Sequence, residues 1–305
     1  MALTKRKLGR TGLEVTDLSY GAMEVRGSRI WGGRAVTEQQ AEIILNAVLD
    51  SGINFIDTSN DYGRSEEFIG RYLHTRRGEY YLATKCGCTV VHKDENTDDT
   101  PHVWTRENLF RGLHESLERM KTDYIDVMQL HNPSVEQAEE GDLVSVLLEM
   151  KQQGKVRWVG CSATSPHIES YIKLGVFDVF QIPYSALERQ HEDAITLAGE
   201  AGAGTIIRGG VARGEPGVGL GDGGRWTSFE KAGLDELRGG RVAHGVPAAL
   251  HAVSSRDGHD HRGDLDPGAF AGERQDRRTR PPARRCLCRS QAPPERGGSL
   301  KGASR

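Results

Sequence analysis

The feature that most constrains the fold of this chain is a repeated alternation of short apolar strands with amphipathic helices. Seven strand–helix units follow one another along the first 240 residues. The predicted strands are residues 18–21, 53–56, 80–83, 124–130, 156–160, 179–182 and 204–207. The predicted helices are residues 37–48, 65–73, 105–120, 142–152, 166–174, 188–201 and 229–237. Apolar strands separated by helices are typical of a parallel sheet that is buried on both faces.

Such a sheet is either open and doubly wound or closed into a barrel. No GxGxxG motif follows the first strand, which argues against an open dinucleotide-binding sheet. The number of repeats, and the polar residues that follow strand after strand, favour a (β/α)8 TIM barrel of the α/β class, whose active sites lie at the carboxyl ends of the strands. Residues 3–8 and 13–17 flank a glycine-rich turn and predict an N-terminal β-hairpin. Because only seven units are found, we expect the barrel to lack a proper eighth β/α unit.

The composition of the chain changes after Gly239 and Gly240. Residues 241–305 contain 13 Lys or Arg against 7 Asp or Glu, whereas acidic residues outnumber basic ones 36 to 27 before them. Phe270 is the one aromatic residue of this tail, so the tail cannot bury much apolar surface. We therefore expect an incomplete barrel over residues 1–240 and a low-order Arg/Pro/Gly-rich tail over 241–305, with 251–255 (HAVSS) as a poor substitute strand.

Charge and hydropathy exclude several function classes. The net charge of −3 indicates no nucleic-acid partner, and no run of about 18 apolar residues predicts a membrane span. The basic N-terminus lacks an apolar segment behind it, so no secretory signal is predicted. The five cysteines form two CxC pairs and a single Cys161, without the matching spacing of a zinc site, so no metal is predicted and a reducing, cytoplasmic location is the simplest interpretation.

Four polar residues stand at or just after the ends of three consecutive strands. Asp57 and Tyr62 follow the strand of residues 53–56, Lys85 ends the next strand, and His131 ends the one after it. Each of these residues alone has an ordinary structural explanation, such as a loop cap, a rim aromatic, a solvated charge or a hydrogen-bonded core group. Their joint placement predicts that the four side chains meet at one rim of the barrel.

If they meet, they can protonate a carbonyl oxygen. A phenol has a pKa of about 10 in water, and a nearby ammonium group lowers it, so Lys85 would tune Tyr62 while Asp57 holds Lys85 in place. A histidine beside the same oxygen can orient the carbonyl or assist the proton transfer. No side chain supplies a hydride, so reduction of that carbonyl requires a nicotinamide cofactor.

The chain resembles the aldo-keto reductases over about residues 4–240, in the bacterial and channel-subunit branch. The matching segments are GINFIDTSNDYGRSEEFIG, YYLATK, SLERMKTDYIDVMQLHNP, GKVRWVGCSA and FQIPYS, in the family's order and spacing. The resemblance implies a (β/α)8 barrel and NAD(P)H-dependent reduction of an aldehyde or ketone. It also implies that Tyr62 donates the proton, that Lys85 and Asp57 tune it, and that His131 orients the carbonyl.

The resemblance further implies a cofactor site, with NADP expected and NAD as the alternative. Ser162 and Gln181 would hold the nicotinamide carboxamide, while Ala163 replaces the usual Asn. Arg208 takes the place of the usual stacking aromatic residue, and its planar guanidinium group can stack as well. The remaining residues implied for this site are Gly21, Ala22, Met23, Asp57, Gly209 and Gly210.

After Gly240 the resemblance ends. Codons compatible with the tail can be chosen so that a one-nucleotide change of frame reads ESRMEFLLRFTLSHP and then TTIVGTSTPEHLRENVKTAERGPLP. This reading supplies an apolar helix, a strand TTIVGT and a helix start of the family's adenosine-phosphate type. We interpret the tail as an out-of-frame translation, with a genuine disordered basic tail as the alternative.

Three other functions stay open. A protein of this fold could bind the cofactor as a regulatory subunit without turning it over, or could be inactive because of its tail. A metal-dependent hydrolase is a more distant alternative, since the rim lacks an HxH pair although His131 and carboxylates are present. The small carbonyl substrate is not named by the sequence; the predicted pocket loops carry Trp31, His92 and Trp104.

Overall fold

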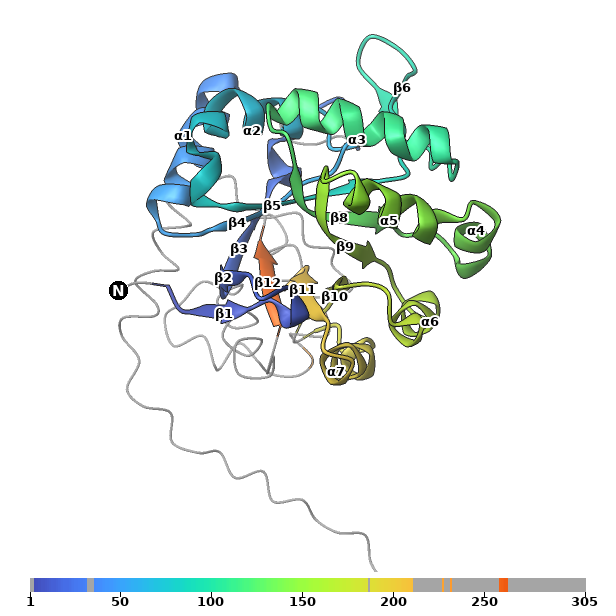
Figure 1. The fold of residues 1–305 in the computed structure, drawn as a ribbon. Coiled ribbons are helices and arrows are strands. Elements are labelled where there is room, and N and C mark those ends of the chain that lie inside the picture. The colour runs from blue at the N-terminus through green and yellow to red at the C-terminus, as the bar shows by residue number, and fades with distance from the viewer. Residues whose placement is uncertain are drawn as a thin grey trace, which may run out of the picture.

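A closed barrel of eight parallel strands forms the centre of the molecule (Figure 1). The computed structural model describes residues 3–31, 36–185, 187–210, 227, 231 and 258–262. Around the barrel the strand order is β10-β11-β12-β3-β4-β5-β8-β9. The strands are β3 (Leu18–Gly21), β4 (Phe55–Asp57), β5 (Tyr81–Cys86), β8 (Ile125–His131), β9 (Val156–Ser162), β10 (Val179–Pro183), β11 (Gly204–Arg208) and β12 (Gly258–Arg262). The predicted α/β barrel is thus confirmed.

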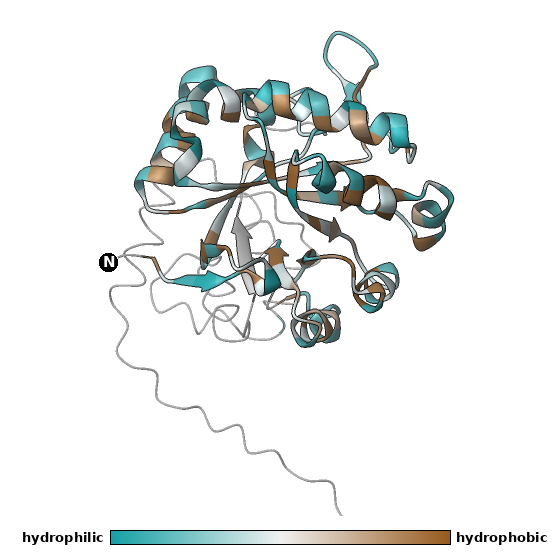
Figure 2. Ribbon diagram, in the orientation of Figure 1, coloured by the Kyte–Doolittle hydropathy of each residue, from teal (hydrophilic) through white to brown (hydrophobic). Residues whose placement is uncertain are grey.

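The described helices form an arc around part of the barrel, from α1 at the upper left of Figure 1 to α7 at the bottom. They are α1 (Glu38–Asp50), α2 (Ser65–Leu73), α3 (Arg106–Met120), α4 (Val135–Glu140), α5 (Leu143–Gln152), α6 (His167–Leu174) and α7 (Glu192–Glu200). Their apolar sides pack on the outer faces of the strands in one large buried cluster, while their polar sides face outward (Figure 2). Of the predicted helix 229–237, only Lys231 is described, and it is helical.

Helix starts follow local signals in the sequence. The Thr37 side chain accepts a hydrogen bond from the Gln40 backbone at 3.1 Å, and the Gln40 side chain accepts one from the Thr37 backbone at 3.0 Å. This is the predicted capping box, which satisfies two backbone donors that have no partner within the helix. Ser134 and Gln137 form a second capping box at α4, a short helix that the sequence analysis did not predict.

A second apolar cluster lies inside the barrel. It joins the strand residues Phe55, Ala83, Val127, Val179 and Ile206 to Leu8 and Val15 of the N-terminal hairpin. The hairpin is formed by β1 (Lys5–Lys7) and β2 (Glu14–Thr16), which pair antiparallel as predicted. The hairpin therefore contributes apolar side chains to the barrel interior as well as preceding the barrel in the chain.

The eighth strand of the barrel lies at a different place in the sequence from the one that we predicted. We expected no proper eighth unit and named residues 251–255 as a poor substitute strand; those residues lie outside the described part of the chain. The eighth strand is β12, which pairs with β11 on one side and with β3 on the other. Its sequence, GHDHR, is polar where a buried parallel strand is ordinarily apolar. The part of the chain that the structure describes ends with β12, so it contains only the strand of this unit.

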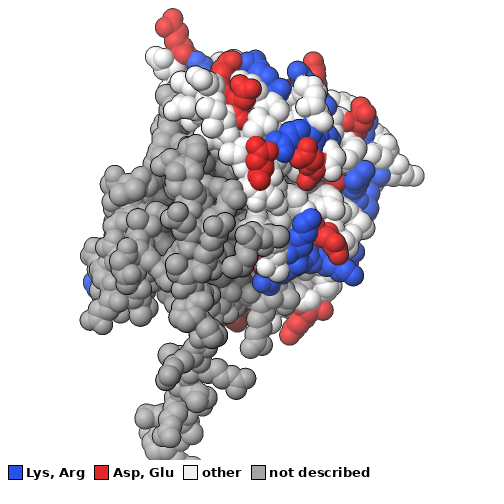
Figure 3. Space-filling view, turned by 90° about the vertical axis from the view of Figure 1, so that its left-hand side faces the viewer, with Lys and Arg blue, Asp and Glu red and all other residues white. Residues whose placement is uncertain are grey.

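The surface carries charges of both signs. On the described residues of the face in Figure 3, Lys and Arg alternate with Asp and Glu over the helices. Many of them are paired, as in the network that joins Arg64 and Arg71 to Glu38 and Glu67. Among the helices that are described, none has the length and apolar character needed to cross a membrane.

Candidate active site

The strand alternation carries polar side chains to one end of the barrel interior. Residues two apart in a strand share a face. Each of the five strand residues of the interior cluster is followed, two positions later, by a polar residue. In chain order these polar residues are Asp57, Lys85, Gln129, Gln181 and Arg208. All five therefore lie toward the carboxyl ends of their strands, where barrel enzymes bind substrates. The interior core and the candidate site are consecutive layers of the same strand faces.

A buried ion pair between Lys85 and Asp57 lies at the centre of this layer. The Lys85 Nζ donates hydrogen bonds to Asp57 Oδ2 at 2.6 Å and to the Thr58 carbonyl at 2.7 Å. The Gln129 side chain donates to the other Asp57 oxygen at 2.8 Å. Burial by itself lowers the pKa of Lys85, but the charge of Asp57, reinforced by Tyr62 and by the hydrogen bond, outweighs burial and raises that pKa. Lys85 is therefore a charged ammonium group at neutral pH.

Tyr62 lies against this ammonium group. The Lys85 Nζ is 4.8 Å from the centre of the Tyr62 ring. The tyrosine is held by a tight turn after β4, in which its backbone N–H donates to the Ser59 carbonyl at 3.1 Å. The next residue, Gly63, has φ +47°, and an added Cβ would lie 2.3 Å from the Arg26 carbonyl oxygen. A glycine is thus required for the turn that presents Tyr62 to the site.

The pKa of Tyr62 differs from the expectation. We expected Lys85 to lower it below its ordinary value. Burial raises the pKa of the phenol and outweighs the opposing charge of Lys85, so the net direction is upward. Lys85 thus limits the rise in pKa, and the phenol keeps its proton at neutral pH, as a proton donor must.

His131, at the end of β8, completes the group. Its ring centre lies 6.2 Å from that of Tyr62, with the planes at 78°. Burial lowers the pKa of His131 to about 4, and nearby Lys85 also acts in this direction, so the imidazole is neutral at pH 7. Its Nδ1 lies 3.0 Å from the Cys88 Sγ and 3.4 Å from the Ser59 Oγ. The structure thus brings together all four residues predicted to meet.

Two of the residues implied for the cofactor face each other across neighbouring strands. Ser162 of β9 is paired in register with Gln181 of β10, and the Ser162 Oγ donates to the Gln181 Oε1 at 3.1 Å. Within the described residues, the buried Gln181 Nε2 has no hydrogen-bond partner. Leaving such a donor unsatisfied costs about 1–3 kcal/mol, which an amide oxygen of a ligand can recover. The nicotinamide carboxamide carries such an oxygen, so these residues fit the expected cofactor.

The other implied residues lie on the same rim. Gly21 ends β3 and is paired in register with Asp57 of β4. Ala22 and Met23 begin the 3₁₀ turn η2 (Ala22–Val25) directly after it. The Ala22 carbonyl accepts a hydrogen bond from the Ser65 Oγ at 2.9 Å, which ties this turn to the start of α2.

Arg208 ends β11 on this rim. Its positive charge lowers the pKa values of both Tyr62 and His131, although burial is the larger effect on each, so the guanidinium group lies within electrostatic reach of both. Gly209 follows with φ +76°, a conformation that favours glycine, and Gly210 is buried behind it. Ala163, the departure from the family pattern, is buried, and its backbone N–H donates to the Gln181 carbonyl at 3.3 Å.

Several residues around the site were missed by the sequence analysis. Gln129 stands between the apolar residues Met128 and Leu130 of β8, and that contrast was the available signal. Cys88 and His102 are paired by an isolated antiparallel bridge, and no periodic pattern of apolar residues in the sequence predicts it. Of the three side chains named for the pocket loops, Trp31 packs edge-on to Tyr62 at 5.9 Å and Trp104 stacks on His102, whereas His92 bonds to Asp98.

A model of the aldo/keto reductase family matches residues 17–215, about two thirds of the chain. The chain belongs to the aldo/keto reductase family. The match contains all four residues of the tetrad Asp57, Tyr62, Lys85 and His131, and ends before the change of composition after Gly240. The predicted family is thus confirmed.

Two bacterial relatives are similar to part of the chain. An uncharacterized oxidoreductase of Bacillus subtilis, YqkF, is 30% identical over 219 residues, which are 70% of this chain and 66% of that protein. An NADH-specific methylglyoxal reductase of Escherichia coli is 29% identical over 207 residues, 63% of this chain and 62% of that protein. The chain thus spans less than two thirds of the length of these curated relatives.

Solved structures of the family have the same fold. The holo form of an aldo-keto reductase from Bacillus halodurans superposes with a TM-score of 0.75 at 26% identity, covering 92% of this chain and 93% of that one. A glycerol dehydrogenase from Gluconobacter oxydans superposes with a TM-score of 0.70 at 24% identity, covering 89% of each chain, which supports the fold alone.

Proposed function

We propose that this aldo/keto reductase reduces a small aldehyde or ketone to an alcohol with a nicotinamide cofactor. The observation that carries the proposal is the buried Lys85–Asp57 pair, held against the ring of a protonated Tyr62 with a neutral His131 beside it. A phenol, an ammonium group and a neutral imidazole facing one space are suited to polarising and protonating a carbonyl oxygen.

Each residue of the tetrad has a separate part in the proposed reaction. Tyr62 gives its phenolic proton to the carbonyl oxygen as negative charge develops there. Lys85 stabilises the phenolate that remains, and Asp57 keeps Lys85 charged and in place. His131 accepts at Nδ1 from the Cys88 thiol in this assignment, which leaves its Nε2–H free to donate to the carbonyl and orient it.

The cofactor would be held at the rim next to the tetrad. Gln181 and Ser162 would bind the nicotinamide carboxamide, and Arg208 with Gly209 and Gly210 would line the dinucleotide. When bound, the reduced nicotinamide supplies the hydride that no side chain can. We favour NADP from the family resemblance; the NADH-specific relative from Escherichia coli supports NAD as the alternative. Comparing kcat/KM for NADPH and NADH decides between them.

A turnover assay with an activated aldehyde tests the activity. Consumption of NADPH or NADH with formation of the alcohol supports the proposal. Cofactor binding without consumption would instead indicate the regulatory protein of the same fold. Neither binding nor turnover would indicate an inactive chain.

The described cysteines bear on the cellular location. Cys86, Cys88 and Cys161 are all buried and free. Free buried thiols are usual in a reducing compartment, which supports a cytoplasmic location. Fractionating cells that express a tagged chain, and measuring which fraction contains the tag, checks this assignment.

The origin of the C-terminal part, from about residue 241, bears on whether this chain is active. We infer that residues from about 241 onward are an out-of-frame translation. In the alternative frame, TTIVGT begins within the codon of His259, so it falls on the codons of β12 (Gly258–Arg262). The proposal therefore predicts that the polar strand β12 replaces an apolar strand at the same place in the barrel. Sequencing the gene around the Gly239 and Gly240 codons tests this; an unshifted reading contradicts it.

A further inference from the structure

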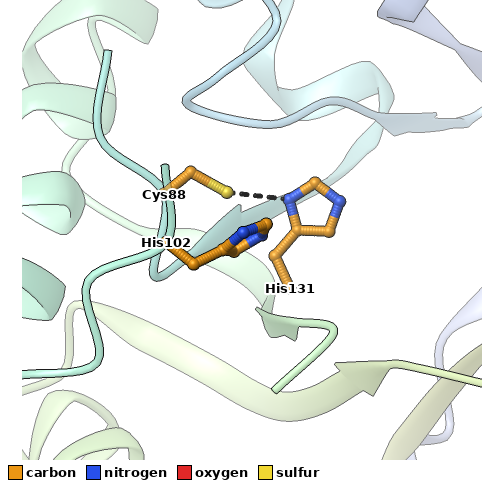
Figure 4. A group of neighbouring side chains, drawn as sticks. All are labelled: Cys88, His102 and His131. Atoms are coloured by element: carbon orange, nitrogen blue, oxygen red, sulfur yellow. Dashed lines mark hydrogen bonds between the residues drawn. The ribbon is translucent and has the colours of Figure 1, made fainter. Parts of the chain in front are cut away.

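Three metal-ligating side chains converge beside the tetrad (Figure 4). The Cys88 Sγ and one ring nitrogen each of His102 and His131 all lie within 4.8 Å of one another. The Cys88 Sγ is 3.0 Å from the His131 Nδ1, and the rings of His102 and His131 lie 5.5 Å apart at 74°. In the proposed reaction His131 orients the carbonyl and Cys88 only sets the tautomer of His131; His102 has no part.

The backbone holds Cys88 and His102 on facing segments. An isolated antiparallel bridge pairs the two residues directly. On either side of it, the Thr89 N–H donates to the Pro101 carbonyl at 2.9 Å and the Val103 N–H donates to the Gly87 carbonyl at 2.7 Å. His102 also stacks on Trp104, with ring centres 5.2 Å apart. Two of the three ligands are thus positioned by secondary structure, and the third by the end of β8.

The buried carboxylate of Asp61 lies next to these three side chains, on the His131 side, and one of its oxygens has no hydrogen-bond partner among the described residues. The Asp61 Oδ2 lies 3.6 Å from the His131 Nδ1. Its Oδ1 is buried and, among the described residues, has no hydrogen-bond partner. Asp61 is only 1% exposed. An unsatisfied buried carboxylate oxygen on a residue that lies against His131 is a costly arrangement, unless a cation or a donor lies within its reach.

We propose that Cys88, His102 and His131 form a zinc-binding site, with Asp61 as the nearby acidic partner, and that zinc in this site inhibits the reductase. Zinc binds thiolate at ~2.3 Å and imidazole at ~2.0–2.1 Å in a tetrahedron, so its ligand atoms lie about 3.3–3.7 Å apart. A group already within 4.8 Å needs only small side-chain adjustments to reach that geometry. A thiolate with two imidazoles is a ligand set that selects zinc over magnesium or calcium.

The chemistry of binding is a simple exchange. One Zn–S bond and two Zn–N bonds form, the Cys88 S–H bond breaks, and its proton leaves to solvent. The fourth position is filled by water, and the Asp61 carboxylate lies outside the three ligands, beside His131. Zinc takes the lone pair of the His131 Nδ1, which accepts from Cys88 in the metal-free protein. The Nε2–H is kept, but the ring has to turn to reach tetrahedral geometry, so the Nε2–H is displaced from the substrate carbonyl. The inhibitory half of the proposal rests on the proposed function, whereas the binding half does not.

Cobalt substitution tests the binding half without any assay of turnover. The purified full-length chain is titrated with Co²⁺, which gives a near-ultraviolet thiolate-to-metal band and visible ligand-field bands at a tetrahedral site. We expect one equivalent to bind with both sets of bands, and Zn²⁺ to displace it. Cys88→Ser should abolish the thiolate band, and Asp61→Asn should weaken binding by ~10–100-fold, as expected for an outer-shell partner.

Matched variants exclude the other thiols. Cys286→Ser/Cys288→Ser removes the second CxC pair and should leave the cobalt spectrum unchanged. Cys161→Ser, at a buried thiol outside the cluster, should leave it unchanged as well. A thiolate band that survives in Cys88→Ser, or disappears with either control, overturns the assignment, and so does the lack of any thiolate band in a folded wild-type chain.

The inhibitory half is measured separately. Wild type and His102→Asn are each compared with their own metal-free rate of aldehyde reduction, and chelator should restore the wild-type rate. We expect the zinc concentration for half inhibition to rise more than ~10-fold in His102→Asn. Cobalt binding without inhibition would overturn the inhibitory half alone, whereas binding in a chain with no turnover would count against the proposed function and leave the metal site standing.

Discussion

Lys85 and Asp57 form a 2.6 Å ion pair in which each side chain is only 1% exposed. Burial of two charges is costly and is compensated here by two further hydrogen bonds, from Lys85 to the Thr58 carbonyl and from Gln129 to Asp57. A pair of this kind gives little net stability, but removal of one partner leaves an unpaired buried charge. Its place beside Tyr62 is the one that the proposed reaction requires.

Removing one partner should destabilise the fold strongly. Lys85→Met or Asp57→Leu alone should lower the free energy of unfolding by about 3–5 kcal/mol, because each leaves an uncompensated charge in the barrel. The double variant should lose much less than the sum of the two, while remaining without reductase activity. Urea unfolding of the four proteins measures this coupling, and additive losses would show that the two side chains do not interact as described.

The pH dependence of carbonyl reduction should show that Tyr62 keeps its phenolic proton up to high pH. The net shift of the Tyr62 pKa is upward, so the protonated, proton-donating form persists above pH 10 rather than being lost near neutrality. We expect kcat/KM for carbonyl reduction to stay level from pH 7 to 9, with the Tyr62-dependent fall above that range. A midpoint of loss near pH 7 would mean that Lys85, and not burial, dominates the environment of the phenol.

The Gln181 Nε2 has no hydrogen-bond partner among the described residues, so removing it should affect stability and cofactor affinity differently. Ser162→Ala with Gln181→Leu removes the unsatisfied Nε2 donor of Gln181 together with both partners of the Ser162 Oγ to Gln181 Oε1 hydrogen bond, so the cofactor-free protein should be as stable as the wild type or slightly more stable. Affinity for the reduced cofactor should fall about 10–100-fold, the equivalent of about 1–3 kcal/mol. Thermal unfolding and fluorescence titration measure the two effects. Unchanged affinity would remove these residues from the cofactor site.

Restoring the alternative frame should strengthen the barrel. The strand TTIVGT would place Ile and Val where β12 now carries GHDHR. Each fully buried side chain of this kind contributes about 1.5–3 kcal/mol, so the restored protein should unfold at a higher temperature. Its NADPH affinity should rise as well, because the segment of the adenosine-phosphate type returns. Equal stability and affinity in the two versions would show that the present tail is the native one.

The sequence predicted the secondary-structure elements and the residues at the strand ends well, but it predicted the contacts between loops poorly. The Thr37–Gln40 capping box, the helix over residues 65–73 and the tetrad could be predicted because short-range hydrogen bonds and strand alternation determine them. The bridge between Cys88 and His102 could not, since it joins loop segments without periodicity. The net pKa of Tyr62 was also missed, because the sequence shows charged neighbours but not the extent of burial that outweighs them.

Replacement of Tyr62 by Phe is the most direct test of the proposed reaction. The variant keeps the ring that packs on Lys85 and removes only the hydroxyl group. In an active version of the chain, we expect kcat/KM for an activated aldehyde to fall by ~10²–10⁴-fold, the usual contribution of a general acid, while fluorescence titration gives an unchanged cofactor affinity. A Tyr62→Phe variant that reduces the aldehyde within a few-fold of the wild-type rate would contradict the account.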